Sequence, residues 1–200
     1  MKLNLAQASV EGATQVQITR NQLLASVTIM STLIALMTGF LTFRIPPLVV
    51  FNAGLLGVYV VSILFGPRIG LLSAGLGSAL AELYLMSTRG DPPIFLIGLL
   101  AARMPAAWLV GISRKKFPVQ GMVIGACLQT AIFLAIDIPI LLGIVGSPLI
   151  FGVKESPSMA IALAFGVPLV VSLPLNIFLV IPAHFVIKGV RAKLGKDFLY

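Results

Sequence analysis

Apolar residues fall into six long runs along the chain, each close to the roughly 17–25 residues that a membrane-spanning helix needs. Short segments rich in proline, glycine or basic residues separate the runs, and proline cannot continue a helix without loss of a hydrogen bond. The pattern predicts an all-α integral membrane protein, a six-transmembrane-helix bundle. The predicted spans are Leu23–Phe43, Leu48–Phe65, Ile69–Met86, Ile94–Ile112, Gly121–Val145 and Met159–Ile187.

Both ends of the chain are more polar than the middle. Residues 1–20 are predicted to form a cytoplasmic segment whose apolar residues recur at the spacing of an interfacial helix, and residues 21–188 to form the membrane domain. Residues 189–200 form a predicted basic cytoplasmic tail. The longest predicted loop is Gly146–Ser158. Prolines within the fifth and sixth runs predict tilted or kinked helices.

Composition and charge narrow the class further. Apolar residues make up 58% of the chain and charged residues 10%, against roughly 25% charged in soluble domains, so a soluble enzyme is excluded. If six spans place both termini on one side, that side carries most of the cations, which predicts cytoplasmic termini in a cell membrane. The ten cations there are Lys2, Arg20, Arg68, Arg114, Lys115, Lys116, Lys188, Arg191, Lys193 and Lys196, against Arg44, Arg89 and Lys154 opposite.

Three charged residues interrupt the apolar runs: Glu82, Arg103 and Asp137. Each costs roughly 2.5–3.5 kcal/mol at the centre of a span, so such residues usually face the bundle interior and meet a partner or a ligand. They gather towards the outer half of the predicted bundle. A ligand site, a purely structural ion-pair network and a proton or ion relay all remain open. The predicted substrate-binding residues are Arg44, Asn52, Glu82, Arg103, Trp108, Asp137 and Asn176.

Small residues recur every four positions in several predicted spans, which lets neighbouring helices approach closely. Ser31, Ala35 and Gly39 form such a stripe in the first span, and further stripes pass through the third and fifth spans. The first stripe either packs within the chain or contacts a separate subunit. Cys127 is expected to be a buried thiol, and His184 an interfacial residue without a function.

Sequence motifs for several other functions are missing. The chain has no P-loop, no nucleophile motif and no clustered metal ligands, so no catalytic residue, cofactor or metal is expected and the chain is not predicted to be an enzyme. The run Arg114-Lys115-Lys116 follows the fourth span and is interpreted as a topology anchor, so no nucleic-acid partner is expected.

The layout as a whole resembles the substrate-binding S component of an energy-coupling factor (ECF) transporter. The resemblance depends on the six spans, the small-residue stripe of the first span and the glycine-rich segment that runs from Phe65-Gly66-Pro67 to Gly77. It implies that the chain captures a vitamin or similar micronutrient from outside and topples in the bilayer to release it. It also implies two kinds of partner, a membrane T subunit that would contact Ser31, Ala35 and Gly39, and two cytoplasmic ATPases.

Two other functions stay open at this point. An integral membrane enzyme acting on lipids would need a polar cluster near the cytoplasmic interface, where the sequence offers only His184 and the basic tail. A self-contained secondary transporter often shows an inverted repeat, and none is evident. The start of the chain lacks the Met-His of the cobalt and nickel type of S component, which argues against a metal cargo.

Overall fold

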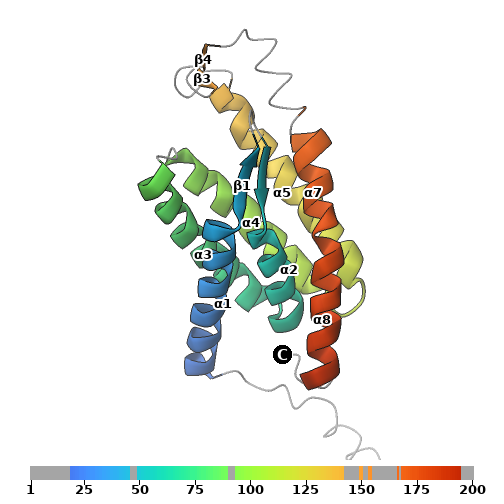
Figure 1. Ribbon diagram of the computed structural model, residues 1–200. Helices are drawn as coiled ribbons and strands as arrows, with labels where there is room; N and C mark the ends of the chain where they lie inside the picture. The colour runs from blue at the N-terminus through green and yellow to red at the C-terminus, as the bar shows by residue number, and fades with distance from the viewer. Residues whose placement is uncertain are drawn as a thin grey trace, which may run out of the picture.

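The computed structural model describes residues 19–45, 49–89, 93–141, 149–150, 153–154, 166 and 168–194; the side chains of Arg44 and Asp137 lie outside the described parts. Within these residues, five helices are long and apolar enough to cross a membrane. They pack side by side into one bundle (Figure 1). The chain therefore has the architecture of a multi-pass helical membrane protein. The five stretches are Arg20–Phe40, Pro67–Arg89, Leu96–Ser113, Pro118–Ile136 and Leu169–Lys193.

The first four of these stretches belong to helices α1 (Arg20–Phe40), α3 (Pro67–Arg89), α4 (Ile94–Ser113) and α5 (Pro118–Leu141). Thr19 caps α1 in a capping box, in which its hydroxyl accepts from the Gln22 amide at 3.3 Å and the Gln22 side chain accepts from the Thr19 amide at 3.0 Å. Helices α3 and α5 both begin with proline, whose missing N–H costs nothing in the first turn.

The predicted second span, Leu48–Phe65, is wrong over its first part. Strand β1 (Thr42–Ile45) pairs antiparallel with strand β2 (Val49–Asn52), and Thr42 lies opposite Asn52. Helix α2 begins only at Gly54 and ends at Phe65. Valine and phenylalanine favour extended backbone, and a short apolar run does not distinguish a strand from a helix. The first helix has the predicted length of 21 residues but lies three residues earlier in the chain, because α1 begins at Arg20 and ends at Phe40.

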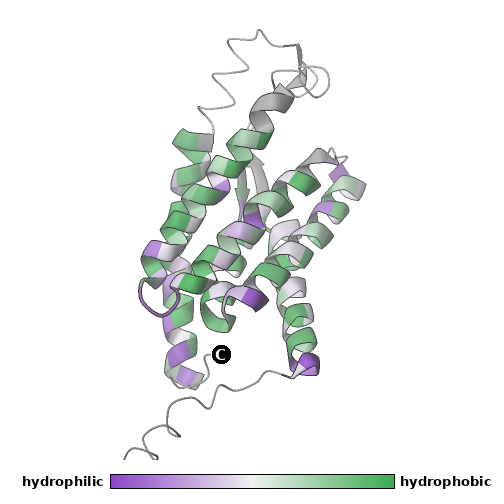
Figure 2. Cartoon of the chain, turned by 180° about the vertical axis from the view of Figure 1, so that it is seen from behind, coloured by the Kyte–Doolittle hydropathy of each residue, from purple (hydrophilic) through white to green (hydrophobic). Residues whose placement is uncertain are grey.

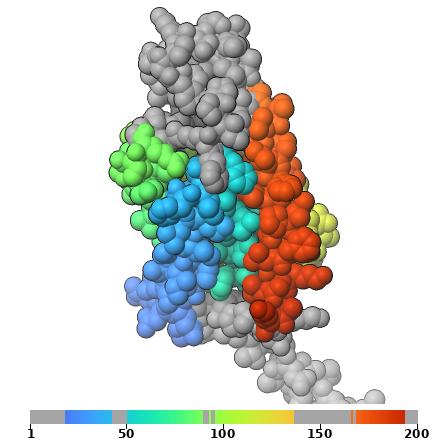
Figure 3. Space-filling model, viewed as in Figure 1, coloured from blue at the N-terminus to red at the C-terminus, as the bar shows by residue number. Residues whose placement is uncertain are grey.

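Helix α2 lies at the centre of the bundle. It packs against α1, α3, α4 and the C-terminal helix α8 (Val180–Leu194), and its side chains are buried around almost the whole circumference. Val58, Tyr59 and Val61 are fully buried. Figure 3 shows α1 and the C-terminal segment flanking α2 on one face of the molecule.

The C-terminal crossing is built from three consecutive pieces. A π-helix, η1 (Pro168–Ser172), leads into α7 (Leu173–Phe178), and a turn at Leu179 separates α7 from α8. Pro182 has no N–H to donate to the carbonyl of Phe178, which accounts for the interruption there. The tilt or kink expected from the prolines stays a prediction. Helix α8 continues to Leu194, six residues beyond the predicted end of the membrane domain at 188.

Glycines set the distances between neighbouring helices. A Cβ atom at Gly77 of α3 would lie 2.6 Å from the carbonyl oxygen of Ser31 in α1, and one at Gly125 of α5 would lie 2.6 Å from Val110 Cγ2 in α4. The predicted close packing through small residues is thus confirmed at both contacts. Hydrophobic residues predominate along the helices (Figure 2), and many large apolar side chains are exposed, as expected for helices that face lipid.

A second short strand pair, β3 (Leu149–Ile150) with β4 (Val153–Lys154), falls within the predicted loop Gly146–Ser158, most of which lies outside the described residues. The same holds for residues 1–18 and 195–200 of the predicted terminal segments.

Candidate functional site

Arg103 in the middle of α4 is the centre of a buried polar cluster. Its side chain is only 1% exposed, and it is the largest fully buried side chain among the described residues. Its Nη1 donates to Thr38 Oγ1 of α1 and to Ser78 Oγ of α3, both at 2.9 Å. One guanidinium therefore joins three helices. We call the set Thr38, Ser78, Glu82 and Arg103 the arginine cluster.

Glu82 supplies the opposite charge. It lies one helical turn beyond Ser78 on the same face of α3, is 6% exposed, and interacts electrostatically with Arg103. An isolated charge at this depth would be expensive, and a partner of opposite sign reduces that cost. The two ionisable residues that the sequence singled out on the third and fourth spans are therefore brought together.

Local packing explains why these side chains can meet. Gly75 faces Met104, where a Cβ atom would lie 3.0 Å from the sulfur, so α3 and α4 approach closely next to Arg103. On the other side of α3, Gly77 brings α1 close enough for Thr38 and Ser78 to reach the same guanidinium nitrogen. Small residues on both faces of α3 thus position the cluster.

The start of α2 adds polar groups beside the cluster. Asn52 Oδ1 accepts from the Gly54 amide at 2.8 Å, and a Cβ atom at Gly54 would overlap Thr38 Oγ1. One turn further on, the buried Tyr59 interacts electrostatically with Arg103, and its hydroxyl donates to the carbonyl oxygen of Asn176 at 3.4 Å. Asn52 therefore lies near Thr38, and the main-chain carbonyl of Asn176 lies near the hydroxyl of Tyr59.

Arg103 retains hydrogen-bonding capacity that the described residues do not use. Its Nε is fully buried and has no hydrogen-bond partner in the structure. Gln129 Oε1 and Thr130 Oγ1 of α5 are likewise buried without a partner. A buried donor left unsatisfied costs roughly 1–3 kcal/mol. Such groups are expected where a protein binds a polar ligand, because the ligand completes the hydrogen bonding.

Not all the predicted substrate-binding residues join this cluster. Trp108 is 50% exposed, and it lies on the opposite face of α4 from Ala102, Arg103 and Ala106, which are buried. The structure therefore does not bring Trp108 to the cluster. The side chains of Arg44 and Asp137 lie outside the described residues, although their backbones belong to β1 and α5.

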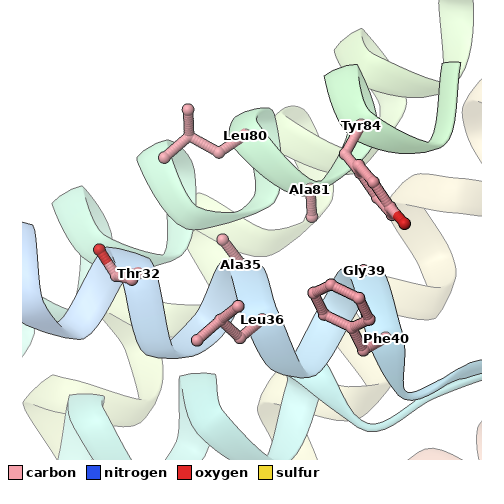
Figure 4. A pocket seen from close by; sticks show the side chains of 8 residues that line it. All are labelled: Thr32, Ala35, Leu36, Gly39, Phe40, Leu80, Ala81 and Tyr84. Atoms are coloured by element: carbon pink, nitrogen blue, oxygen red, sulfur yellow. The ribbon is translucent and has the colours of Figure 1, made fainter. Parts of the chain in front are cut away.

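The small-residue stripe of α1 divides between two environments. Ser31 is 3% exposed and packs under Gly77 of α3. Ala35 and Gly39 instead line an open apolar groove of about 200 Å³ between α1 and α3 (Figure 4). The rings of Phe40 and Tyr84, 5.6 Å apart between centroids, lie at one end of the groove. The residues that line it are Thr32, Ala35, Leu36, Gly39, Phe40, Leu80, Ala81 and Tyr84.

The remaining candidates for chemistry lie apart from the cluster. Cys127 is exposed on α5, so the expectation of a buried thiol is wrong. Ala126 and Gln129 face the interior of the bundle, whereas position 127 lies on the outward face of the same helix. His184 is exposed on α8 beside the ring of Phe185. Within the described residues, no group of three or more His, Cys, Asp or Glu could hold a metal ion.

The sequence did not point to Thr38 or Tyr59. Thr38 is one of several threonines in the first apolar run, and only the fold shows which of them faces Arg103. Tyr59 carried a detectable signal, because it is the one aromatic hydroxyl in the second apolar run.

No protein-family model, curated protein or solved structure matches this chain.

Proposed function

We propose that this chain is the membrane-embedded substrate-binding subunit of an importer, an S component of the ECF type that captures a small polar micronutrient. The observation that carries the proposal is the buried arginine cluster, in which a guanidinium and a carboxylate lie together at membrane depth and Arg103 Nε has no partner. Ionisable residues within spans are expensive, and where they occur they usually mark a substrate or ion pathway.

The chemistry of the cluster favours a ligand with both an anionic and a cationic or hydrogen-bonding end. Arg103 is suited to a carboxylate or another anionic group, because a guanidinium offers several donors in one plane. Glu82, with Asp137 as a further candidate, is suited to a cationic or donor group. Asn52 and Asn176, which lie near Thr38 and Tyr59, are further candidates, and so is Arg44. Trp108 faces away from the cluster and is left out of the proposed site.

The proposed topology has six crossings. Helix α2 together with the β1–β2 hairpin forms the second crossing, and η1, α7 and α8 form the sixth. The cations then favour cytoplasmic termini, since Arg20, Arg114 and Arg191 all lie at the end of the bundle where α1 begins and α8 ends. The polar cluster lies beyond the middle of α1 from that end, which supports capture from outside.

The groove between α1 and α3 is the proposed docking surface for a membrane T subunit, which would couple the chain to two ATPases. Ala35 and Gly39 give the groove a smooth floor, and small residues at a helix surface permit close contact with another helix in lipid. Exposed Leu36 and Phe40 flank that floor. Ser31, the third residue of the stripe, is buried between α1 and α3 and holds these two helices together.

The test has a binding arm and a partner arm. The protein is purified gently and examined by native mass spectrometry for a retained small molecule, and the identified compound is then titrated against Arg103→Lys and Glu82→Gln. Each variant removes at least one charge-assisted contact, so affinity is expected to fall about tenfold or more. Arg89→Gln, which changes an exposed arginine at the end of α3, is the matched control.

Co-purification from the native membrane provides the partner arm. A second membrane protein and ATPase subunits should accompany the wild type and be lost with Gly39→Leu, which fills the groove. If both cluster variants bind the retained compound like the wild type, the site assignment is refuted. If the wild type brings down no ATPase, the importer assignment fails.

A further inference from the structure

Two half-buried arginines lie at one end of the bundle. We call this end, where α1 begins and α8 ends, the basic end. Its described basic residues are Arg20, Arg68, Arg114, Lys115, Lys116, Lys188, Arg191 and Lys193. Figure 2 shows hydrophilic residues at the corresponding ends of α1 and α8. Six of these side chains are exposed, but Arg114 and Arg191 are half-buried. Arg114 and Arg191 are therefore more buried than basic residues that only fix the orientation of a helix in the membrane.

Arg114 covers the turn between α2 and α3. Gly66 in this turn has a positive φ of 87°, and a Cβ atom there would lie 2.6 Å from Arg114 Nη1 and 3.0 Å from its Cζ. Gly111 packs on the same turn, because its Cβ would lie 2.5 Å from the Cα of Pro67. The backbone of the turn and the end of α4 thus hold the guanidinium in one place.

Arg191 brings a second positive charge to this position. It lies in the last turn of α8, which packs against α2. Burial lowers the pKa of Arg114 below its usual value, and the charge of Arg191 lowers it further. Both arginines belong to elements that pack on α2: Arg114 lies on Gly66 at its end, and Arg191 is in the last turn of α8. Their like charges repel.

Both arginines also keep buried donors that make no hydrogen bond. Arg114 Nη1 and Arg191 Nε are each buried without a partner. Among the described side chains the one carboxylate is Glu82, which interacts with Arg103 instead. Two adjacent like charges with unused donors are unfavourable by themselves, and an anion between them relieves both the repulsion and the unmet hydrogen bonding.

We propose that Arg114 and Arg191 together bind one phosphate-bearing anion, the headgroup of an acidic membrane lipid. Guanidinium groups match phosphate oxygens in geometry and stay charged, so a pair of them forms a stronger phosphate site than scattered lysines. Basic pockets between spanning helices at the cytoplasmic surface are suited to acidic headgroups. The bound lipid fastens α8 to the turns that end α2 and α4. This site is independent of the arginine cluster and of the proposed importer function.

The experiment measures lipid binding to the full chain in detergent micelles. Native mass spectrometry compares phosphatidylglycerol with phosphatidylcholine for the wild type, for Arg114→Gln/Arg191→Gln, and for the control Lys116→Gln/Lys193→Gln. The control removes the same net charge from exposed positions at the same end. A single variant, Arg191→Gln, serves if the double variant does not fold. A second arm measures the melting temperature with inorganic phosphate against chloride at equal ionic strength.

We expect the wild type to prefer phosphatidylglycerol and the arginine variants to lose roughly tenfold or more in affinity relative to the lysine control, since one charge-assisted hydrogen bond has at least that effect. Stabilisation by inorganic phosphate without a preference for phosphatidylglycerol overturns the assignment to lipid and assigns the site to a soluble phosphate. Equal losses in the arginine and lysine pairs, or no response to either probe, overturn the site altogether.

Discussion

Replacing Arg103 with methionine should be among the most destabilising single substitutions in this chain. Methionine retains most of the length of the side chain but removes the charge and both hydrogen bonds from Nη1 to Thr38 and Ser78. It also removes a positive charge that interacts electrostatically with the buried Glu82. Both hydrogen bonds involve a charged donor, so their loss is costlier than the loss of bonds between neutral groups.

The expected loss can be built from these contributions. Hydrogen bonds to a charged group contribute roughly 1.5–3 kcal/mol each, more than the average of about 0.6 kcal/mol for interhelical hydrogen bonds within membranes. Loss of both bonds from Arg103 Nη1 should therefore lower the free energy of unfolding by about 3–5 kcal/mol. Because Arg103 and Glu82 interact electrostatically, Glu82→Gln should cost less in the Arg103→Met background than in the wild type, so the two changes should not be additive.

The assay is reversible unfolding in mixed micelles, followed by circular dichroism, for the wild type, both single variants and the double variant. Arg89→Gln serves as the control and should stay within about 0.5 kcal/mol of the wild type, because that side chain is exposed. A loss below about 1 kcal/mol for Arg103→Met would falsify the role given to the two buried hydrogen bonds, and strict additivity with Glu82→Gln would contradict the electrostatic interaction of Arg103 with Glu82.

Three further predictions concern helix packing and the lipid-facing surface. Gly77→Ala places a Cβ atom 2.6 Å from a carbonyl oxygen of α1 and should lower the free energy of unfolding by about 1–3 kcal/mol. A Cβ atom at Gly189 would have no heavy atom within 4 Å, so the control Gly189→Ala should be neutral or stabilising. Equal effects of the two substitutions would contradict the close contact of α1 and α3. Gly66→Ala should cost at least about 1–3 kcal/mol, since φ 87° with ψ −178° is essentially restricted to glycine, and an unchanged melting temperature would rule that conformation out. Brominated lipids should strongly quench the emission of Trp108, the single tryptophan, because half its surface is exposed on the outer face of α4; emission insensitive to bromine would place it inside the bundle instead.

The helical character and most of the spans could be predicted from the sequence. Four predicted spans overlap helices of the structure closely, because long uniformly apolar runs in lipid have few alternatives to a helix. Pro67 and Pro118 mark the starts of two of them. The second span could not be predicted correctly, because the run that begins at Leu48 contains both a strand and a helix and its apolar character does not change between them.

The candidate site was predictable in part. Glu82 and Arg103 stand out because charge is expensive in a span, and that argument needs no knowledge of the fold. The positions of Thr38 and Trp108 depend on the rotation of α1 and α4, and amphipathic periodicity is weak when both the lipid and the protein interior are apolar. For this reason the sequence groups Trp108 with the charged residues of the spans, whereas in the structure its side chain faces outward.

The length of α2 has a consequence for how the protein is made. Twelve residues of helix extend about 18 Å, well short of a hydrocarbon layer about 30 Å thick. Protein surrounds α2 on nearly every side, and three of the four helices that contact it follow it in the chain. During synthesis α2 therefore cannot partition into the bilayer by itself. It has to stay beside the insertion machinery until α3, α4 and α8 emerge. Chains truncated directly after α2 should consequently be degraded by membrane quality control.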